Sequence, residues 1–482
     1  MPFTPRFASV CLGLCLAVCL GACSDLRGPA SMPPATADMA AVIPNRWYAP
    51  QPHGGDLQAL SDWWQSLGDP VLVTLIHAAE VVSPSLASAQ ANVVQSRSVR
   101  TQAQAANRPT LDANALAERG VTSSTPLVST LLQGSLDASW EIDLFGANRA
   151  SANAAEARYQ SARAQWHVAR VPVAAETATD YFGWQTCQLQ KGIAAQDAAS
   201  RQRSAELTHR SAQAGLTAPV NAALADAASQ DSQSQLTQQT RQCEGLLKAL
   251  VALTGLAEPD LRLQLSSAPP EPLQPQALHV ARIPAELLNQ RPDVYAAQQL
   301  VAAASADLGA AQARRYPRLT LSGSIGALEL NNASGSTDLS TWAIGPLALS
   351  LPIFDGGRQT ANIASAQARY TEATATYRGA VRQAVREVED ALLALAAASD
   401  QEQQARAAAQ SYQIAMHASE ARFQAGTANQ LDLQDARRSL LSAQHNLLQR
   451  GLDQRTAWIA LYRAVGGGWD ARTTESTTPE LP

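Results

Sequence analysis

Three acidic side chains alternate with apolar ones in the stretch LDASWEIDLFG at positions 136–146. Asp137, Glu141 and Asp143 occupy odd positions, and the even positions carry Leu, Ala, Trp and Ile. Successive side chains of a β-strand point to opposite faces, so this pattern predicts a strand with one apolar face and one acidic face. The strand is therefore expected to separate an apolar environment from water.

The polar residues elsewhere do not form a recognisable catalytic or metal site. The sequence has no HExxH pair, no Cys/His cluster with zinc-ligand spacing, no GxSxG motif and no phosphate-binding loop. The formal charge of −5 does not suggest nucleic-acid binding. We therefore predict that the chain is not an enzyme, needs no cofactor or metal and binds no nucleic acid. Its histidines are scattered, at His53, His77, His167, His209, His279, His417 and His445.

The N-terminus has the pattern of a secretory signal peptide. Arg6 precedes the apolar run FASVCLGLCLAVCL at 7–20, which is too short for a mature transmembrane helix. The run ends in Leu-Gly-Ala-Cys at 20–23, which resembles a bacterial lipobox and predicts that Cys23 becomes the acylated first residue. By resemblance to known lipoproteins, Ser24 favours the outer membrane. An ordinary signal peptide with a chance cysteine is the alternative.

The rest of the chain consists of two similar halves. Pro109 and Pro317 lie 208 residues apart, and the Gln-Ala-Gly triplets that end at Gly215 and Gly426 lie 211 apart. Several landmarks in one order at nearly one offset indicate a duplicated unit, too long for a solenoid repeat. The predicted segments are a signal peptide (1–22), a lipid-anchored tether (23–68), a first repeat (69–268), a linker (269–282), a second repeat (283–468) and a flexible tail (469–482).

Each half has the same predicted order of elements: a helix, two strands, a very long helix and a shorter helix. The fold class is therefore mainly α with four strands. Spacings of 4 and 3 between Val381, Val385, Val388, Leu392 and Leu395 are typical of a coiled coil. The predicted ranges are 70–107, 109–119, 132–145, 147–213 and 218–252 in the first half, and 283–315, 317–328, 341–354, 357–424 and 429–464 in the second.

The four strands have the length of tilted strands that cross a bilayer, about ten to twelve residues. Every backbone polar group inside lipid must be paired, so a membrane sheet must close, and four strands are too few. We predict that several copies pool their strands into one barrel, with Asp137, Glu141 and Asp143 facing a water-filled lumen. A soluble antiparallel sheet with one wet face is the alternative, but it leaves the lipobox, the duplication and the long helices unconnected.

Two cysteines remain after the signal peptide and the lipidated residue. Cys187 lies 28 residues before Gly215 and Cys243 lies 28 residues after it, so both sit at one level of a hairpin with its tip at Gly215. An oxidising periplasm permits a disulfide if their Cβ atoms face each other. Two buried thiols are the alternative. The second half has Ala398 and Gln454 at the equivalent positions, so only the first hairpin can be bridged.

Six motifs spread over nearly the whole mature chain carry a family resemblance: WWQSLGDPVL (63–72), WEIDLFGANR (140–149), IPAELLNQRPDV (283–294), RYPRLTLSGSIG (315–326), LPIFDGGR (351–358) and LYRAVGGGW (461–469). With these motifs the chain resembles the outer-membrane efflux channels of tripartite pumps, in the OprM-like and NodT-like lipoprotein branch of the TolC-like family. The resemblance implies a homotrimer with a twelve-stranded barrel in the outer membrane and a long α-helical barrel in the periplasm. It also implies a periplasmic adaptor (membrane-fusion) protein and an inner-membrane pump of the resistance-nodulation-division type as partners, and drugs or other small molecules as cargo.

The resemblance further assigns roles to the hairpin tips. Leu431 and Asp435 are implied to form a periplasmic gate of apolar and acidic rings, and their spacing of four lets both face one side of a helix. Three copies of Asp435 around an axis would repel one another and attract cations. Asp432 competes with it for this role, and a solvated acid beside a packing leucine is the alternative. The implied adaptor-docking tips are Arg210, Gly215, Leu216, Thr217, Arg422, Gly426 and Thr427.

Two other functions stay open at this point. A channel for type I protein secretion would share the same sequence features. A non-channel periplasmic coiled-coil lipoprotein is disfavoured because a scaffold has no need of two amphipathic strand pairs. The expected location is the outer membrane, with a lipid anchor and a long periplasmic portion.

Overall fold

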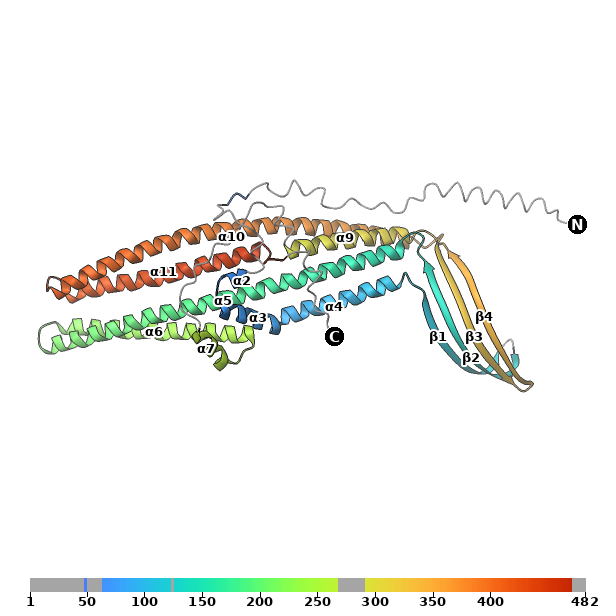
Figure 1. The fold of residues 1–482 in the computed structure, drawn as a ribbon, viewed down its shortest axis with the longest axis horizontal. Coiled ribbons are helices and arrows are strands. Elements are labelled where there is room, and N and C mark those ends of the chain that lie inside the picture. Colours follow the sequence, from blue (N-terminus) through green and yellow to red (C-terminus); the bar gives the residue numbers. More distant parts are fainter. Residues whose placement is uncertain (1–46, 50–62, 123–124, 268–290, 470–482) are drawn as a thin grey trace. The chain divides into compact units, whose positions relative to one another are not determined.

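The computed structural model describes residues 47–49, 63–122, 125–267 and 291–469. The predicted signal peptide, the lipidation site Cys23, the linker and almost all of the tail lie outside these residues. The described elements, shown in Figure 1, are α2 (Trp63–Ser66), α3 (Pro70–Val82), α4 (Pro84–Ala105), β1 (Thr110–Thr122), β2 (Thr125–Ile142), α5 (Ala147–Gln213), α6 (Pro219–Thr254), α7 (Glu258–Ser267), α9 (Pro292–Ala313), β3 (Arg318–Asn332), β4 (Gly335–Ser350), α10 (Arg358–Gln424) and α11 (Gln430–Ala464).

These elements form two compact units, and each unit takes residues from both sequence repeats. The first unit contains 92–162 and 297–378, and so holds the four strands. The second unit contains the described residues up to 91, together with 163–296 and 379–469, and so holds both helical hairpins. The duplication seen in the sequence therefore supplies each unit with two related sets of elements.

The two longest helices confirm the bounds predicted from the sequence to within one residue. Helices α5 and α10 have 67 residues each. Helix α10 begins where the carboxylate of Asp355 accepts the backbone N–H groups of Gly357 and Gln359, both at 3.0 Å, which satisfies donors that a helix start leaves free. Helix α5 continues through Pro172, which removes one helical hydrogen bond without ending the helix.

The predicted helix over 70–107 was wrong, because the structure has two helices there. Asp69 caps α3, its Oδ1 accepting the N–H of Val71 at 3.0 Å and of Leu72 at 3.2 Å. Ser83 then adopts an extended backbone with ψ of 120°. The residue before a proline is disfavoured in the helical conformation, and Pro84 follows immediately. Helix α7 was also not predicted.

No single described helix has the length and hydropathy of a membrane span. The pair α3 and α4 meets both criteria when taken together, across a bend of 54°.

The four strands form one antiparallel sheet in the order β1-β2-β3-β4. The strands are longer than predicted, at 13 to 18 residues. The polar segments 120–126 and 331–338 were expected to be turns, but Thr122 pairs with Thr125 and Asn332 pairs with Gly335, so the ladder continues almost to the hairpin ends.

Within the second unit, four helix segments lie side by side in the order α10, α11, α5 and α6 (Figure 1). Their hydrophobic core gathers where Trp63 and Trp64 of α2 meet Tyr462 of α11. Tyr181 of α5 is fully buried there, and its hydroxyl donates to Asp69 Oδ2 at 2.6 Å. Burial and this hydrogen bond raise the pKa of Tyr181, so the hydroxyl stays a donor.

Candidate channel sheet and helical tips

The sheet has one apolar face. Directly opposed residues share a face, and the even-numbered residues of β2 stand opposite odd-numbered residues of β3. One cross-strand row reads Leu136, Ile325 and Trp342, and all three side chains are exposed. Further rows on this face add these exposed or half-exposed side chains: Leu111, Trp140, Leu321, Ile344, Leu347 and Leu349.

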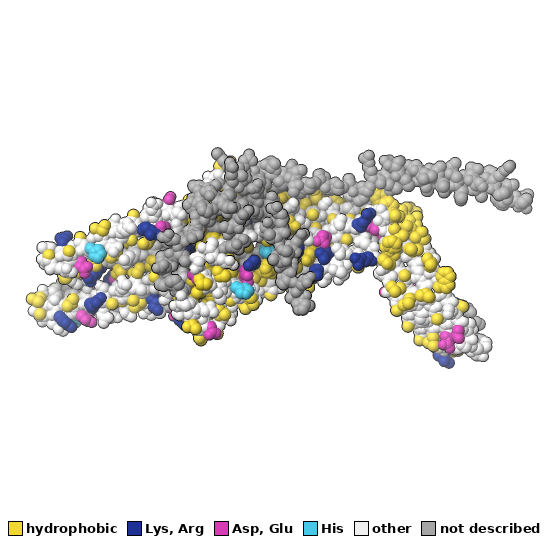
Figure 2. Space-filling view, in the orientation of Figure 1, with side chains coloured by type: hydrophobic (Ala, Val, Ile, Leu, Met, Phe, Trp, Pro, Cys, Tyr) yellow, Lys and Arg dark blue, Asp and Glu magenta, His cyan; other side chains and the backbone are white. Residues whose placement is uncertain are grey.

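This apolar face is too large to be an ordinary protein surface. Trp342 is 76% exposed and Ile344 is 86% exposed. Figure 2 shows hydrophobic side chains gathered over the strands, with acidic and basic ones at the far end of the sheet. The sequence places Glu118, Glu329 and Asp338 near the hairpin ends. A wide exposed apolar band with a charged end is the surface expected of strands in contact with lipid.

The opposite face of the sheet is polar around Asp137 and Glu141, whereas farther toward the hairpin ends it carries Leu116, Leu328 and Leu339. Asp137 and Glu141 lie on it, together with Ser135 and Ser324. The carboxylate of Asp137 accepts hydrogen bonds from Asn114 at 2.7 Å and from Ser135 at 2.8 Å. These contacts keep the acid on the polar face. The alternation predicted from the sequence is thus confirmed for these two acids, while the lumen that they are expected to face stays a prediction.

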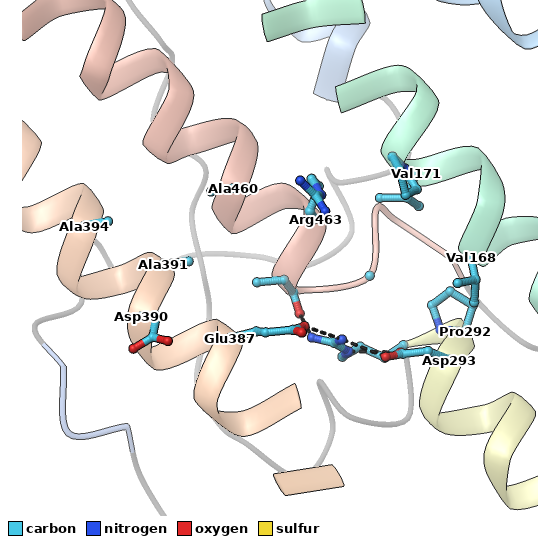
Figure 3. Close-up of a pocket in the computed structure, with 14 residues that line it drawn as sticks. Val168, Val171, Pro292, Asp293, Glu387, Asp390, Ala391, Ala394, Ala460 and Arg463 are labelled. Atoms are coloured by element: carbon cyan, nitrogen blue, oxygen red, sulfur yellow. Dashed lines mark hydrogen bonds and ion pairs between the residues drawn. The ribbon is translucent and has the colours of Figure 1, made fainter. Parts of the chain in front are cut away.

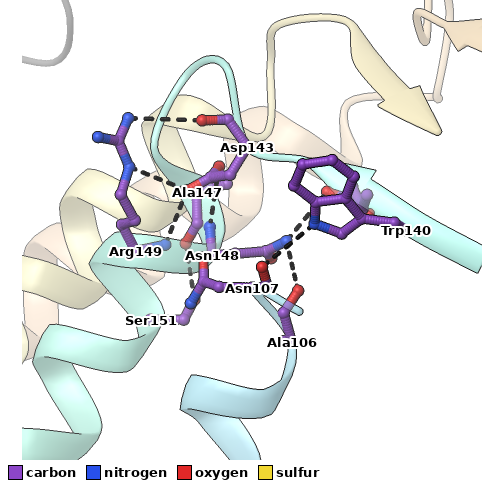
Figure 4. A network of polar contacts seen from close by, with 9 residues as sticks. Ala106, Asn107, Trp140, Asp143, Ala147, Asn148, Arg149 and Ser151 are labelled. Carbon is purple, nitrogen blue, oxygen red and sulfur yellow. Dashed lines mark hydrogen bonds and ion pairs between the residues drawn. The ribbon is translucent and has the colours of Figure 1, made fainter. Parts of the chain in front are cut away.

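Asp143 was wrongly placed on the strand, because β2 ends at Ile142. Its carboxylate accepts the backbone N–H groups of Asn148 at 3.2 Å and Arg149 at 2.9 Å, and the Arg149 side chain at 3.3 Å (Figure 4). The Asp143 side chain is only 10% exposed. Its negative charge stabilises the N-terminus of α5, where free N–H groups are concentrated.

Both hairpin tips turn at a glycine, as predicted. Gly215 has φ of 73° and Gly426 has φ of 71°, a conformation that glycine adopts without steric cost. In the first tip the N–H of Leu216 donates to the carbonyl of Ser211 at 2.9 Å, and in the second the N–H of Thr427 donates to the carbonyl of Arg422 at 2.9 Å. The Leu216 side chain is 81% exposed, so the first tip presents an apolar side chain to solvent.

The predicted gate residues lie in the first turns of α11. Leu431 is 68% exposed. The carboxylate of Asp435 accepts a hydrogen bond from Arg438 at 2.5 Å and remains half exposed. Asp432 instead belongs to a capping box, in which its N–H donates to Asn429 Oδ1 at 2.8 Å and its carboxylate accepts the N–H of Asn429 at 3.4 Å. Both acids therefore have a local partner, and which of them forms the acidic ring of the gate stays a prediction.

The first hairpin carries the predicted disulfide. Cys187 of α5 and Cys243 of α6 are joined, with Cα atoms 5.5 Å apart, within the range of ordinary disulfides. Both residues are buried. The sequence argument from equal distances to the tip is confirmed, and the alternative of two free thiols was wrong.

An arginine that sequence reasoning did not single out lies buried in the second unit. Arg291 is 6% exposed, and it donates to the carbonyl of Ala464 at 2.6 Å, to Glu387 at 2.7 Å and to Asp293 at 2.7 and 3.0 Å (Figure 3). It thereby links the start of α9 to α10 and to the end of α11. The adjacent cavity of about 470 Å³ is also lined by Arg463, Asp390 and several alanines. Arg291 belongs to the motif IPAELLNQRPDV at 283–294, and its place in that motif is the sequence signal that could have indicated it.

A group of three or more His, Cys, Asp or Glu side chains able to hold a metal ion is absent from the part of the chain that the structure describes. The polar residues described above instead cap helix ends or join neighbouring helices. The two features that remain for a function are the two-faced sheet and the hairpin tips.

The family model of outer membrane efflux proteins matches residues 75–256 and 283–467. The chain belongs to this family. It is 30% identical over 456 residues to the outer membrane protein OprJ of Pseudomonas aeruginosa. This alignment covers 92% of this chain and 94% of OprJ. It is 29% identical to the solvent efflux pump outer membrane protein SrpC of Pseudomonas putida, over 96% of this chain and 98% of SrpC.

A solved structure supports the same assignment. The outer-membrane channel OprN is 27% identical in sequence and superposes with a TM-score of 0.75, over 92% of this chain and 98% of OprN. The mainly helical fold with four strands per chain, predicted from the sequence, is therefore confirmed. As a member of the outer membrane efflux protein family, the chain is better explained as a channel than as a protein-secretion conduit or a coiled-coil scaffold.

Proposed function

We propose that this protein is the lipid-anchored outer-membrane channel of a tripartite efflux system, built from three copies. The observation that carries the proposal is the four-stranded sheet with one exposed apolar face and one polar face. Family membership supports it. Neither a soluble enzyme nor a scaffold has a use for such a surface.

The sheet supports oligomerisation because its ladder is open. Within the described residues, β1 and β4 each pair on one side only. An unpaired strand edge inside lipid leaves backbone groups unsatisfied, so β1 of one copy pairs with β4 of the next. Three copies give twelve strands, an even number within the range of membrane barrels. The apolar face then meets lipid, and Asp137 and Glu141 face the water inside.

The hairpin tips supply the periplasmic end. Leu431 and Asp435 narrow the passage there, and the three Asp435 carboxylates favour cations over anions. The exposed tip residues dock a periplasmic adaptor, which connects the channel to an inner-membrane pump of the resistance-nodulation-division type. These tip residues are Arg210, Gly215, Leu216, Thr217, Arg422, Gly426 and Thr427.

The cargo is a class of small molecules and not one compound. The SrpC name refers to solvent efflux, which supports small apolar cargo for this chain too. Acylation of Cys23 fixes the protein to the outer membrane, and the residues after it form the tether.

The channel proposal is tested on the full-length protein purified in detergent. Its mass by light scattering should correspond to three copies, and planar bilayers that contain it should conduct ions. A single copy without ion flux would overturn the proposal. Loss of membrane attachment in a Cys23→Ser variant, measured by fractionation, tests the anchor separately.

The gate is tested by single-channel conductance. Asp435→Ala should raise the conductance several-fold, because it removes the ring of acids from the constriction. Asp226→Ala, at an exposed acid on α6, is the matched control and should leave conductance unchanged. An unchanged conductance in the Asp435→Ala trimer would remove that residue from the gate.

A further inference from the structure

A cavity lies where the strands of the first unit meet its helices. It has a volume of about 480 Å³, and its walls come from the junctions β2–α5, α9–β3 and β4–α10. All of its lining residues belong to the first unit. Three arginines line it: Arg314, Arg318 and Arg358. Three cations in one cavity raise the question of which anion balances them.

The charges of these arginines are not balanced by ion pairs. Within the described residues none of the three forms a salt bridge, and all three are exposed. Arg314 donates to the hydroxyl of Ser151 at 3.3 Å, which leaves its charge uncompensated. Each guanidinium therefore keeps N–H donors for a negatively charged partner.

The acids that line the same cavity are fewer, and one of them is already paired. They are Asp143 and Glu141. Asp143 accepts the side chain of Arg149 at 3.3 Å and two backbone N–H groups (Figure 4). Glu141 accepts an amide hydrogen from Asn148 at 3.4 Å. The three arginines thus share one carboxylate that has no arginine of its own among the described residues, so the cavity carries an excess of positive charge.

The duplication shows that the fold does not require two of these arginines. At the offset of 208 residues, Arg314 and Arg318 correspond to Ala106 and Thr110. The first repeat passes from α4 to β1 at the same positions at which the second repeat passes from α9 to β3. The same turn is therefore made with uncharged side chains in the first repeat, and the two charges are extra features of the second.

The third arginine has a counterpart that is paired. In the motifs WEIDLFGANR and LPIFDGGR equivalent residues lie 209 apart, so Arg358 corresponds to Arg149 and Pro352 corresponds to Asp143. Proline has no side-chain acceptor for a guanidinium. The carboxylate of Asp355 accepts backbone N–H groups at the start of α10. The second repeat thus keeps the arginine and lacks the acid that pairs with it in the first.

Apolar side chains form the rest of the wall. Phe145 and Tyr316 line the cavity and stack on each other, with ring centroids 4.9 Å apart and an interplanar angle of 16°. Leu144 and Leu351 add side chains that are 58% and 50% exposed. Such side chains favour contact with an apolar body over contact with water. The cavity therefore combines cationic groups with apolar surface, as a site for an organic anion requires.

We propose that this cavity binds an organic anion, namely a carboxylate, sulfonate or phosphate group carried on an aromatic or apolar body. The anionic group binds Arg318 and Arg358, whose planar guanidinium groups match its paired oxygens. The body lies against the stacked rings of Phe145 and Tyr316. The excess positive charge of the cavity selects an anion over a neutral molecule of the same shape.

The site also names a cargo class for the channel. Glu141 pairs with Thr320 across the sheet, and Arg318 is two residues before Thr320, so Arg318 and Glu141 share a face. In the proposed channel this face meets the water inside, and organic anions bind on their way out. This role rests on the proposed function, whereas binding of the anion does not.

Equilibrium dialysis of the full-length protein in detergent tests the binding. The probe is 2-naphthoate, and 2-naphthamide is its uncharged analogue. The wild type should bind naphthoate more tightly than naphthamide, after subtraction of a detergent blank. Arg318→Gln/Arg358→Gln should lower the affinity for naphthoate about tenfold, because charge-assisted hydrogen bonds are lost, and should leave the affinity for naphthamide unchanged.

Two further measurements sharpen the test. Arg97→Gln/Arg203→Gln is the matched control, since it removes two exposed arginines that do not line the cavity, and it should bind naphthoate as the wild type does. In planar bilayers under a KCl gradient, the reversal potential of Arg318→Gln/Arg358→Gln should shift toward that of potassium, because positive charge is removed from the passage.

The outcomes separate the site from the channel proposal. A trimeric, conducting protein overturns the site if it binds naphthoate no better than naphthamide, or if both double variants bind as the wild type does. Binding that depends on Arg318 and Arg358 without a change in reversal potential overturns the cargo role and supports the site. A protein that binds naphthoate through these arginines but is monomeric and does not conduct overturns the channel alone.

Discussion

The first repeat holds its helical hairpin with a covalent bond, whereas the second has Ala398 and Gln454 at the same positions. In the second hairpin Gln454 donates instead to Ser399 at 3.3 Å. The two hairpins have nearly the same lengths and the same tip geometry despite this difference. The disulfide is therefore an addition to a hairpin that helix packing already specifies.

At the starts of α4 and α9 it is the second repeat that has the additional link and the first repeat that lacks it. In the second repeat Arg291 precedes Pro292 and joins Glu387 and the carbonyl of Ala464. In the first repeat Ser83 precedes Pro84, and its hydrogen bonds within the described residues go to Ser85 and to the first turn of α4.

The acid that corresponds to Glu387 in the first repeat is Glu176, four residues before Asp180 on α5. No cation pairs with Glu176 among the described residues. Burial and the charge of Glu176 raise the pKa of Asp180. The comparison teaches that a duplicated helical frame accepts different polar contacts at equivalent positions, since long apolar seams set its shape. Stability in each half then depends on different residues.

Removing the disulfide should produce the largest change, and only in the first hairpin. Cys187→Ala/Cys243→Ala opens a link across 56 positions, which should lower the free energy of unfolding by about 4 kcal/mol in the chain-entropy estimate. Thermal unfolding followed by circular dichroism measures this. A reducing agent should lower the wild-type midpoint to that of the variant and leave the variant unchanged. Equal midpoints for oxidised and reduced wild type would contradict a stabilising bridge.

Removing the buried arginine should weaken the second repeat by nearly as much. Arg291→Met leaves the carbonyl of Ala464 and two acids without their partner. The free energy of unfolding should fall by about 3 kcal/mol. This value is near the low end for buried ion pairs, because both acids are over a third exposed. Urea unfolding measures the loss. Arg386→Met, at an arginine that is two-thirds exposed, is the control and should change little. A similar loss in both variants would deny Arg291 a special role.

A smaller effect should depend on pH and on the first repeat alone. Burial, followed by the charges of Arg170 and Arg163, lowers the pKa of His167 to about 4 from its usual 6.5. The unfolded chain therefore binds a proton that the folded chain does not. The contribution of the neutral imidazole to the free energy of unfolding is fully present above pH 6.5 and is lost as the pH falls toward 4. The loss between pH 7 and pH 5 is about 2 kcal/mol.

The comparison that isolates this histidine is His167→Phe. The equivalent residue in the second repeat is Arg378, so the second repeat has no histidine at this position. The drop in unfolding midpoint between pH 7 and pH 5 should shrink in the variant. The same drop in both proteins would assign the pH dependence to other groups.

The smallest expected effect concerns the starts of α6 and α11. Asn429 caps α11 with a capping box, whereas Ala218 precedes α6 without a side-chain cap. Asn429→Ala should lower stability by about 1 kcal/mol, and Ala218→Asn should raise it by a few tenths. Hydrogen exchange of the first-turn amides in each helix measures both changes. The comparison fails if Asn429→Ala leaves the α11 amides as protected as before.

The parts of the fold that could be predicted are those that local pattern decides. The bounds of α5 followed from a long run with helical spacing and from a glycine at its end. The faces of β2 followed from strict alternation. The disulfide followed from counting residues on either side of Gly215, because a helical hairpin converts sequence distance into height along its axis.

The parts that could not be predicted depend on local backbone conformation or on contacts distant in sequence. Ser83 lies in a helical pattern, and only the proline after it marks the break. Asp143 continues an alternation, yet its carboxylate binds the free N–H groups of α5. Arg291 meets residues 96 and 173 positions away, which spacing cannot reveal.

Gly467, which follows α11, determines how closely the backbone there approaches α5. At Gly467, where φ is 64°, an added Cβ would lie 2.4 Å from Val171 Cγ2. Any side chain there would have to push α5 and the segment around Gly467 apart. Trp469, which packs next to His167, lies only two residues farther on. The absence of a single methyl group thus fixes how closely residues 466–469 can lie against α5.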